Sequence, residues 1–335
     1  MISRRDFLVR SGMAGAALLS RSVLSQNATQ AAPSGPQAAP PQPAAPPGVQ
    51  PEPNLIQELE TYAATEKIRT TKLRDTLFLL EGVGGNIICQ IGPDGKLLID
   101  AQMAAGTQHL LDSLSKLDAQ PLKLLVNTHW HPDHTDGNAA LHMAGAFIIA
   151  QINTRMRLAS PQYMAVYDLH VSAAPDAALP QDTFSETETL WVNNDQEDLI
   201  HAPYAHTDSD IFVQFHNGNV IHTGDLWFNG MYPLIDTSTG GTINGMIRGV
   251  DAVLALADDQ TKIVPGHGPL GDKAGLQAYR TMLVTVADRV EKLKAQGDTV
   301  EQAIAAKPTA DMDAAWTKQG AIQPNTFVAL VYESL

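Results

Sequence analysis

The sequence predicts an α/β protein in which two mixed β-sheets are stacked face to face with helices on the outside. Short apolar strands and amphipathic helices alternate along the chain from about residue 55. Consecutive strands followed by helices occur twice, and each half places a histidine or an aspartate just after a strand ends. A sheet with an apolar face must bury it against another layer, so we expect an αββα sandwich.

The strands and helices of the first half can be placed from their patterns. Alternating or continuous apolar residues predict strands, and residues at helical spacing predict a helix. The turn sequence GPDGK at 92–96 joins two of the strands as a hairpin. The expected strands are TLFLLEG (76–82), NIICQI (86–91), KLLIDA (96–101), KLLVNTH (123–129) and AFIIAQ (146–151), and the expected helix is GTQHLLDSLSKL (106–117).

The second half repeats this order. Its expected strands are ETLWV (188–192), DLIHAP (198–203), DIFVQF (210–215), NVIHTG (219–224) and the start of KIVPGHG (262–268). Its expected helices are NGMIRGVDAVLALA (244–257) and a long amphipathic segment over about 272–294. We therefore expect one catalytic domain over residues 55–335, with helices at its C-terminal end.

The N-terminal region predicts export. Arg4 and Arg5 precede Asp6, Phe7 and Leu8, as in a twin-arginine signal. The apolar run that follows is far shorter than the roughly 20 residues needed to cross a bilayer. We expect a signal peptide over 1–25, a periplasmic location and no stable membrane insertion after cleavage. Residues 26–54 are rich in Pro and Ala and predict a disordered linker.

Composition excludes several classes of protein. With 335 residues and 44% hydrophobic content the chain can bury a sizeable core. Its formal net charge of -14 would repel nucleic acid, so we expect no nucleic-acid partner. Cys89 is the only cysteine, which excludes an intramolecular disulfide, and its apolar surroundings predict a buried side chain. The sequence predicts no oligomeric state.

One short stretch, THWHPDHTDGN (128–138), carries an unusual density of metal-binding groups. Imidazole and carboxylate are ligands that zinc prefers, and a catalytic zinc keeps one position open for water. One metal could take the first pair of side chains in this stretch and a second could take the other pair, with further ligands from later strand ends. The candidates are His129, His131, Asp133 and His134, followed by His206, Asp225 and His267.

The HxHxDH pattern with three later ligands resembles the metallo-β-lactamase superfamily of dinuclear metallohydrolases, over about residues 66–290. The resemblance implies the αββα fold and two Zn²⁺ ions, the first bound by His129, His131 and His206. It implies that Asp133, His134 and His267 bind the second ion and that Asp225 bridges both. Asp133 would also orient a metal-activated hydroxide, which makes it a catalytic residue.

The resemblance also implies a function, namely hydrolysis of a small cyclic or activated carbonyl substrate. We expect β-lactam hydrolysis first, and a lactonase or a thioester hydrolase similar to glyoxalase II as the alternative. Because no basic clamp for a glutathione tail follows His267, the glyoxalase II interpretation is the weaker one. A non-catalytic metal-binding protein is a third interpretation, which the complete ligand set disfavours.

Candidate substrate contacts lie near the ligands. Asn229 and Tyr232 follow Asp225 and could donate a hydrogen bond to the substrate, or could serve the loop alone. Arg155 and Arg157 could bind a carboxylate, although helix-surface charges are the commoner explanation.

The shape of the site can also be anticipated from the sequence. The short VGG segment at 83–85 stands where β-lactamases of the superfamily carry a longer flap, so we expect an open cleft. Trp130, Trp227 and Phe228 could wall the cleft or support the ligands, and His222 lies close enough to Asp225 for a hydrogen bond to it.

Overall fold

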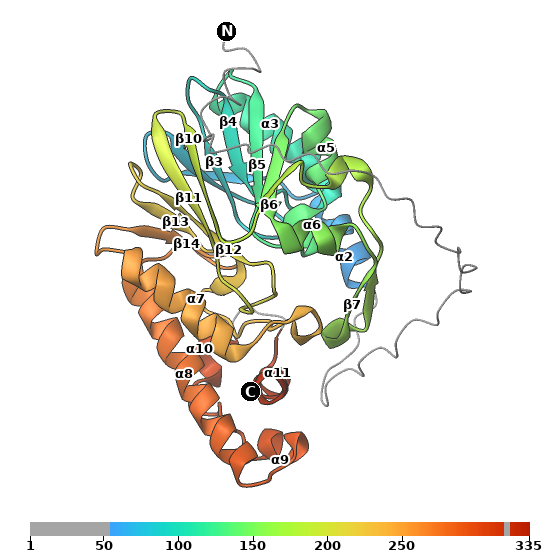
Figure 1. Cartoon of the computed structure of the whole chain (residues 1–335), viewed down its shortest axis with the longest axis vertical. Coiled ribbons are helices and arrows are strands. Elements are labelled where there is room, and N and C mark those ends of the chain that lie inside the picture. Colours follow the sequence, from blue (N-terminus) through green and yellow to red (C-terminus); the bar gives the residue numbers. More distant parts are fainter. Residues whose placement is uncertain (1–53, 318–321) are drawn as a thin grey trace, which may run out of the picture. The chain divides into compact units, whose positions relative to one another are not determined.

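The computed structural model describes residues 54–317 and 322–335 (Figure 1). The predicted signal peptide and the predicted linker, except Asn54, lie outside the described residues. The first described element is helix α2 (Leu55–Ala63), which precedes the first predicted strand and was not itself predicted. Leu55, Leu59 and Ala63 follow one another at helical spacing, which explains why this segment is a helix.

The first sheet has seven strands in the order β1-β2-β3-β4-β5-β6-β9. Its first four strands are antiparallel neighbours, whereas β4, β5, β6 and β9 run parallel, so the sheet is mixed. The strands are β1 (Arg69–Lys72), β2 (Leu77–Glu81), β3 (Ile87–Gln90), β4 (Lys96–Ile99), β5 (Leu122–Asn127), β6 (Phe147–Gln151) and β9 (Asp182–Phe184).

The second sheet has five strands in sequence order. The first three pairings are antiparallel and the last is parallel, so this sheet is mixed too. Its strands are β10 (Thr187–Val192), β11 (Asp195–His201), β12 (Ile211–Phe215), β13 (Val220–His222) and β14 (Lys262–Val264). Strands β7 (Gln162–Met164) and β8 (Leu169–Val171) form a separate antiparallel pair.

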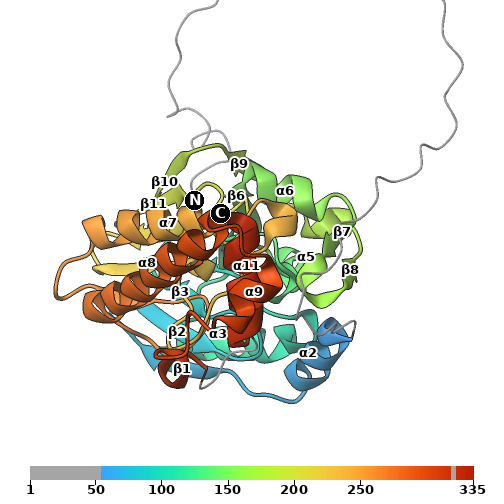
Figure 2. The ribbon, with the colours of Figure 1, turned by 90° about the horizontal axis from the view of Figure 1, so that it is seen from below.

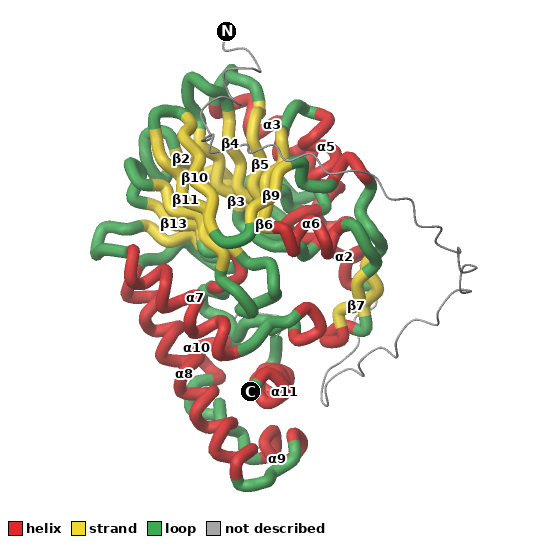
Figure 3. Tube along the Cα trace, in the orientation of Figure 1, coloured by secondary structure: helices red, strands yellow, loops and turns green. Residues whose placement is uncertain are grey.

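Three apolar clusters hold the layers together. One lies between the two sheets and joins residues such as Ile99 of β4 to Val213 of β12. The second covers the outer face of the first sheet with α3 (Thr107–Leu117) and α5 (Asn138–Met143). Helices thus flank both sheets, and the predicted αββα sandwich is confirmed (Figures 1 and 3).

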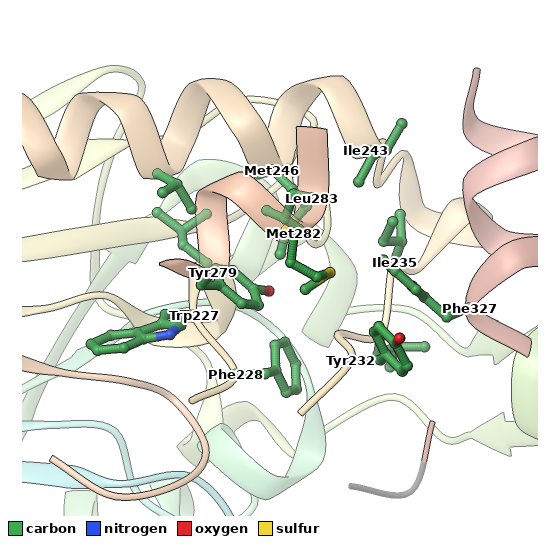
Figure 4. Packing of buried hydrophobic residues seen from close by; sticks show 14 of the residues in the cluster. Trp227, Phe228, Tyr232, Ile235, Ile243, Met246, Tyr279, Met282, Leu283 and Phe327 are labelled. Carbon is green, nitrogen blue, oxygen red and sulfur yellow. The ribbon is translucent and has the colours of Figure 1, made fainter. Parts of the chain in front are cut away.

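The third cluster, the largest, covers the outer face of the second sheet. Figure 2 shows the helices α7, α8, α9 and α11 gathered there, and Figure 4 shows Tyr279, Met282 and Leu283 of α8 packed beside Trp227 and Phe228. The remaining helices are α4 (Pro132–Thr135), α6 (Ile152–Leu158), α7 (Ile243–Leu256), α8 (Lys273–Ala295), α9 (Val300–Ala305), α10 (Asp313–Trp316) and α11 (Pro324–Ser334).

The strands and helices named from the sequence are confirmed, with ends shifted by a few residues. Strand β1 was not predicted, because all four of its residues are exposed and it has no apolar pattern. Cys89 is fully buried in β3 as expected, and burial raises the pKa of its thiol to about 12. In the part of the chain that the structure describes, no helix combines the length and apolarity that a bilayer crossing requires.

Glu197 of β11 is a fully buried carboxyl group between the sheets. Its Oε1 accepts a hydrogen bond from the Gln90 amide at 2.6 Å, but its Oε2 has no partner among the described residues. Burial raises the pKa of Glu197 to about 8. Because the folded-state pKa exceeds the ordinary value, this group stabilises the fold at low pH, and that stabilisation is lost as the pH rises through about 8.

We therefore expect Glu197→Gln to raise the melting temperature at pH 9 by about 3 °C or more, because no charge must then be buried. At pH 5 the variant and the parent should melt within about 1 °C of each other. Differential scanning calorimetry at both pH values measures this, with exposed Glu186→Gln as the matched control. If the difference in melting temperature between Glu197→Gln and the parent were the same at pH 9 as at pH 5, the raised pKa of Glu197 would be contradicted.

Candidate metal centre

The seven candidate ligands come from loops that follow strand ends. His129 and His131 follow β5, and helix α4 begins at Pro132 directly after them, which turns Asp133 and His134 back toward the same place. The other three ligands come from the second sheet. His206 follows β11, Asp225 follows β13 and His267 follows β14.

The structure brings all seven side chains together in two groups. His129, His131, His206 and Asp225 form one group, and Asp133, His134 and His267 form the other. Within each group the potential ligand atoms lie within 4.8 Å of one another. The other six side chains divide as the family resemblance implied, with Asp225 in the first group here.

Asp225 lies between the two groups. Its Oδ2 is 3.3 Å from Nε2 of His206 and 3.7 Å from Nε2 of His129. Its Oδ1 is 3.2 Å from Nε2 of His134, and its Oδ2 is 3.5 Å from Nε2 of His267. One carboxylate therefore contacts histidines of both groups, which is the position that a bridging ligand requires.

Two histidines of the first group turn nitrogens toward each other. His206 donates from Nδ1 to the Leu234 carbonyl at 2.8 Å, and His131 donates from Nε2 to the Asp236 carboxylate at 3.1 Å. A neutral imidazole has only one N–H, so Nε2 of His206 carries a lone pair. It lies 2.8 Å from Nδ1 of His131, and these are the two ring nitrogens that a metal would bind.

Asp100, at the end of β4, fixes the orientation of two more ligands. It accepts a hydrogen bond from Nδ1 of His134 at 2.7 Å and another from the Thr128 hydroxyl at 2.8 Å. Because that hydroxyl donates to Asp100, it accepts from Nδ1 of His129, 3.1 Å away. His129 thus directs a bare Nε2 into the site, as metal-binding histidines do. Burial alone would lower the pKa of His134, but the carboxylates of Asp225, Asp133 and Asp100 raise it well above its usual range, so a metal would displace a proton from its Nε2.

Unsatisfied polar atoms test whether the site fits a metal. Nε2 of His129 and Oδ1 of Asp225 are buried and lack a hydrogen-bond partner in the described residues. Buried polar atoms without a partner are rare, and each calls for an explanation such as a bound ion. Both atoms point into the cluster, so the donor set fits a metal.

Charge favours the same conclusion. Burial and the neighbouring imidazoles lower the pKa of His129, and burial lowers that of His206 to about 4, so both rings are neutral at pH 7. Burial alone would raise the pKa of Asp225, but His267 and His134 hold it well below its usual range. The centre therefore combines the neutral imidazoles of His129 and His206 with the ionised carboxylate of Asp225, which attracts a cation.

His267 carries the proton that a metal would displace. Burial alone would lower its pKa, but the carboxylates of Asp225 and Asp133 raise it to about 10. Its Nε2 lies 3.1 Å from Oδ2 of Asp133. Metal binding would release this proton, because an imidazole must be deprotonated to act as a ligand.

Two glycines make room for the ligands. Gly224 has a φ of +49°, which disfavours other residues, and it precedes Asp225. A Cβ on Gly266 would lie 1.9 Å from Oδ1 of Asp225, so this position requires the absence of a side chain.

The VGG segment packs directly against the ligands. The Gly85 N–H donates to the Asp133 carbonyl at 3.1 Å, and a Cβ on Gly85 would lie 2.1 Å from the His134 ring. The VGG segment therefore lies in close contact with Asp133 and His134, and a side chain at Gly85 would collide with the His134 ring.

His222 does not bond directly to a ligand, contrary to one expectation. Its Nε2 contacts the Asn86 carbonyl at 2.8 Å, and its Nδ1 accepts a hydrogen bond from the Gly224 N–H at 3.0 Å. His222 thus supports the turn that carries Asp225. Two supporting carboxylates, Asp100 and Asp236, were not anticipated. Asp100 ends a recognisable strand, but the sequence around Asp236 gives no signal.

Removing the Asp236 carboxylate should weaken metal binding. Asp236 is buried and holds the Nε2 proton of His131, so Asp236→Ala should lower zinc affinity about 10- to 100-fold. Competition with a chromogenic chelator measures this affinity, and Asp259→Ala on the exposed surface is the matched control. Unchanged affinity in Asp236→Ala would show that His131 needs no such support.

The two residues proposed to contact substrate are engaged by the protein itself. The Asn229 amide donates to the Pro269 carbonyl at 2.8 Å, and Asn229 does not line the cavity at the site. Tyr232 lines this cavity, but its hydroxyl donates to Asp313 at 2.9 Å. Neither residue joins the ligand cluster, and both side chains stabilise loops around it.

The arginines and the tryptophans have structural roles. Arg157 pairs with Asp208 at 2.7 Å and Arg155 donates to the Pro180 carbonyl, so both are occupied outside the cavity. Trp130 and Trp227 are buried supports. Phe228 alone of the three aromatic residues lines the cavity, and it stacks on His267 with the ring centres 5.3 Å apart.

A cavity of about 420 Å³ opens onto both groups of ligands. No long flap covers the cavity in the described residues, and residues of α2 and of the β7–β8 region line it. Its apolar lining residues are Leu55, Ile56, Leu59, Met164, Tyr167, Leu169, Phe228, Met231, Tyr232, Leu234 and Ile322, and the rest are Gly84, His131, Pro132, Asp133, Asp225, His267 and Gly268.

This fold and this cluster define a metal-dependent hydrolase. The family model of the metallo-beta-lactamase superfamily matches residues 81–267, so the chain belongs to that superfamily. The match contains every candidate ligand from His129 to His267. The recognised family and its fold are therefore confirmed.

Individual relatives are more distant. A probable hydroxyacylglutathione hydrolase of Schizosaccharomyces pombe is 28% identical over 149 residues, which is 44% of this chain and 48% of that relative. The match thus spans about half the length of the curated relative.

Solved structures share the fold. A metallo-beta-lactamase from Pontibacter korlensis aligns with a TM-score of 0.54 and 20% identity, over 65% of this chain and 99% of that one. A sec-alkylsulfatase from Pseudomonas sp. aligns with a TM-score of 0.62 and 17% identity, over 85% of this chain and 53% of that one.

Proposed function

We propose that the protein is a dinuclear zinc hydrolase that cleaves the ester or lactone bond of a small, uncharged substrate. The observation that supports this most directly is the cavity. Its polar lining consists mainly of candidate ligands, and its remaining side chains are apolar. None of its described lining residues is Lys or Arg.

The donor set supports zinc and a count of two. Five imidazoles and two carboxylates form the cluster, and imidazole-rich sites suit zinc better than magnesium or calcium. His129, His131 and His206 would hold one ion, and Asp133, His134 and His267 the other. Asp225 would bridge them, since it contacts histidines of both groups.

Bound zinc would act as a Lewis acid that activates water and polarises the carbonyl of the substrate. The chain itself would place the reacting bond beside His131, Asp133 and Asp225, which all line the cavity. Asp133 remains ionised, because His134 and His267 hold its pKa well below the usual range against the effect of burial. Its carboxylate would therefore accept a hydrogen bond from the attacking water and orient it.

Thioester hydrolysis is the second candidate, because the Schizosaccharomyces pombe relative is named for it. β-Lactam hydrolysis, the first expectation, has less support from the cavity, because β-lactams carry a carboxylate that a cationic side chain would bind. β-Lactams and glutathione thioesters are anionic, whereas the described lining residues include no Lys or Arg that would pair with their carboxylates.

Export to the periplasm belongs to the same proposal. The paired Arg4 and Arg5 support a twin-arginine signal over 1–25, followed by a linker over 26–54 and a catalytic domain over 55–335.

The test compares three substrates on the zinc-loaded protein: 4-nitrophenyl butyrate, a chromogenic cephalosporin and a hydroxyacylglutathione. We expect kcat/KM to be highest on the ester and to disappear when a chelator removes the metal. A higher value on the cephalosporin would replace this proposal with a β-lactamase. Equal turnover with and without metal would contradict a metal-dependent activity altogether.

A further inference from the structure

The cavity beside the metal centre has an apolar wall whose residues the proposed chemistry does not use. Leu55, Ile56 and Leu59 supply one part of it from α2. Met164 of β7 and Leu169 of β8 supply another part. Figures 1 and 2 both place α2 and the β7–β8 pair on the same side of the sandwich.

Helix α2 is fixed in place by contacts outside the cavity. The Glu60 carboxylate accepts hydrogen bonds from the Ala104 N–H at 3.2 Å and the Ala105 N–H at 2.7 Å. The Ala64 carbonyl at the end of the helix contacts Nε2 of His109 at 3.1 Å. These polar contacts hold the second half of α2, while Ile56 in its first half packs against the third apolar cluster.

The apolar side chains at the start of α2 remain partly exposed. Leu55, Ile56 and Leu59 are half-buried, whereas Ala63 on the same face is fully buried. Apolar area that stays in contact with water in a cavity favours a ligand that covers it. The wall therefore presents exposed apolar surface to which an apolar group could bind.

The size and charge of the cavity limit what this group can be. The cavity has a volume of about 420 Å³, within the range of about 300–1,000 Å³ for small-molecule sites. A cavity of this size accommodates a group much larger than acetyl. Apart from the candidate ligands, its described lining residues carry no charged side chain, so none of them would pair with an anionic tail. An uncharged chain is the chemistry that fits.

We propose that the substrate carries an aliphatic acyl chain, which lies against α2 and the β7–β8 pair, and that Leu59 is a residue that determines the preferred chain length. This inference rests on the proposed function, since it assigns the substrate of the same site. It makes α2, which precedes the residues matched by the family model, part of the substrate site.

Chain length tests this directly. For the zinc-loaded full chain, kcat/KM on 4-nitrophenyl octanoate should exceed that on 4-nitrophenyl acetate at least tenfold, since each buried methylene adds binding. Leu59→Ala should lower this ratio about fivefold. Tyr62→Ala is the matched control, because Tyr62 is an apolar residue of α2 that is 61% exposed and outside the cavity lining.

A second measurement separates this inference from the proposed function. Calorimetric binding of octanohydroxamic acid and acetohydroxamic acid needs no turnover, and we expect the longer probe to bind at least tenfold more tightly. Leu59→Ala should reduce that preference, and Tyr62→Ala should preserve it. If no ester is hydrolysed but the preference for the longer probe persists, the proposed function fails and the acyl-chain site stands.

Two results would overturn the acyl-chain site. One is an octanoate-to-acetate ratio near 1, together with equal binding of the two hydroxamic acids. The other is a Leu59→Ala protein that melts like the parent and keeps the full preference for long chains. Tighter binding of glutaric monohydroxamic acid, which carries a carboxylate, than of octanohydroxamic acid would also contradict an uncharged chain.

Discussion

Replacing Asp225 by alanine is expected to lower kcat/KM about a thousandfold or more while the folded structure persists. Asp225 is the only described residue whose carboxylate is close to histidines of both groups, at 3.2 Å from His134 and 3.3 Å from His206. Without it neither metal would keep a full set of ligands, and the distance between the two metals would no longer be fixed. Lost ligands at catalytic metals remove most of the rate enhancement.

The measurement for Asp225→Ala combines ester turnover with circular dichroism and melting temperature. Asp259→Ala is a suitable control, because Asp259 is an exposed aspartate outside the cavity lining. Turnover within tenfold of the parent in Asp225→Ala would show that Asp225 does not bridge two metals.

Gly266→Ala should abolish turnover without changing any ligand. The added Cβ would lie 1.9 Å from Oδ1 of Asp225 and 2.8 Å from the Gly224 carbonyl, so both the carboxylate and its turn must move. A displacement of about 1 Å at a catalytic site costs about a hundredfold in rate, and we expect at least that loss. Bound zinc should fall as well.

Gly106→Ala is the matched control for this change. Its added Cβ would meet Ala63 at 3.5 Å, an ordinary contact, and Gly106 does not line the cavity. Ester turnover and zinc content are measured for Gly266→Ala, Gly106→Ala and the parent in parallel. If Gly266→Ala retained parental zinc content and turnover, the close approach of this loop to Asp225 would have no functional importance.

The ligand set could be predicted from sequence because its signal is local. His129, His131, Asp133 and His134 lie within six residues, and the later ligands each follow a strand with a clear apolar pattern. The two sheets could be predicted for the same reason, since their central strands are continuous apolar runs.

The walls of the site could not be predicted from the sequence. Helix α2 contacts the cavity from a segment about 70 residues before the HxHxDH motif, and β7 and β8 are strands of three residues each, too short for a periodic pattern. The expectation of an open cleft considered only the VGG segment. It did not include elements that are remote in sequence and that line the cavity.

Supporting residues were missed or misassigned because hydrogen-bond partners depend on tertiary structure. Asp236 lies more than 100 residues from His131, which it orients. Tyr232 was a candidate donor to substrate, with a role in the loop as the alternative, and its hydroxyl donates to Asp313 on α10. A side chain near a ligand in sequence can therefore point away from the site, and a distant one can complete it.

Zinc content of the full-length protein, measured by mass spectrometry beside ester turnover before and after chelation, tests the central claim most directly. The account predicts two zinc ions per chain, turnover that disappears when they are removed, and turnover that returns when they are restored. A protein that hydrolyses the ester equally well with less than one metal ion per chain would contradict it.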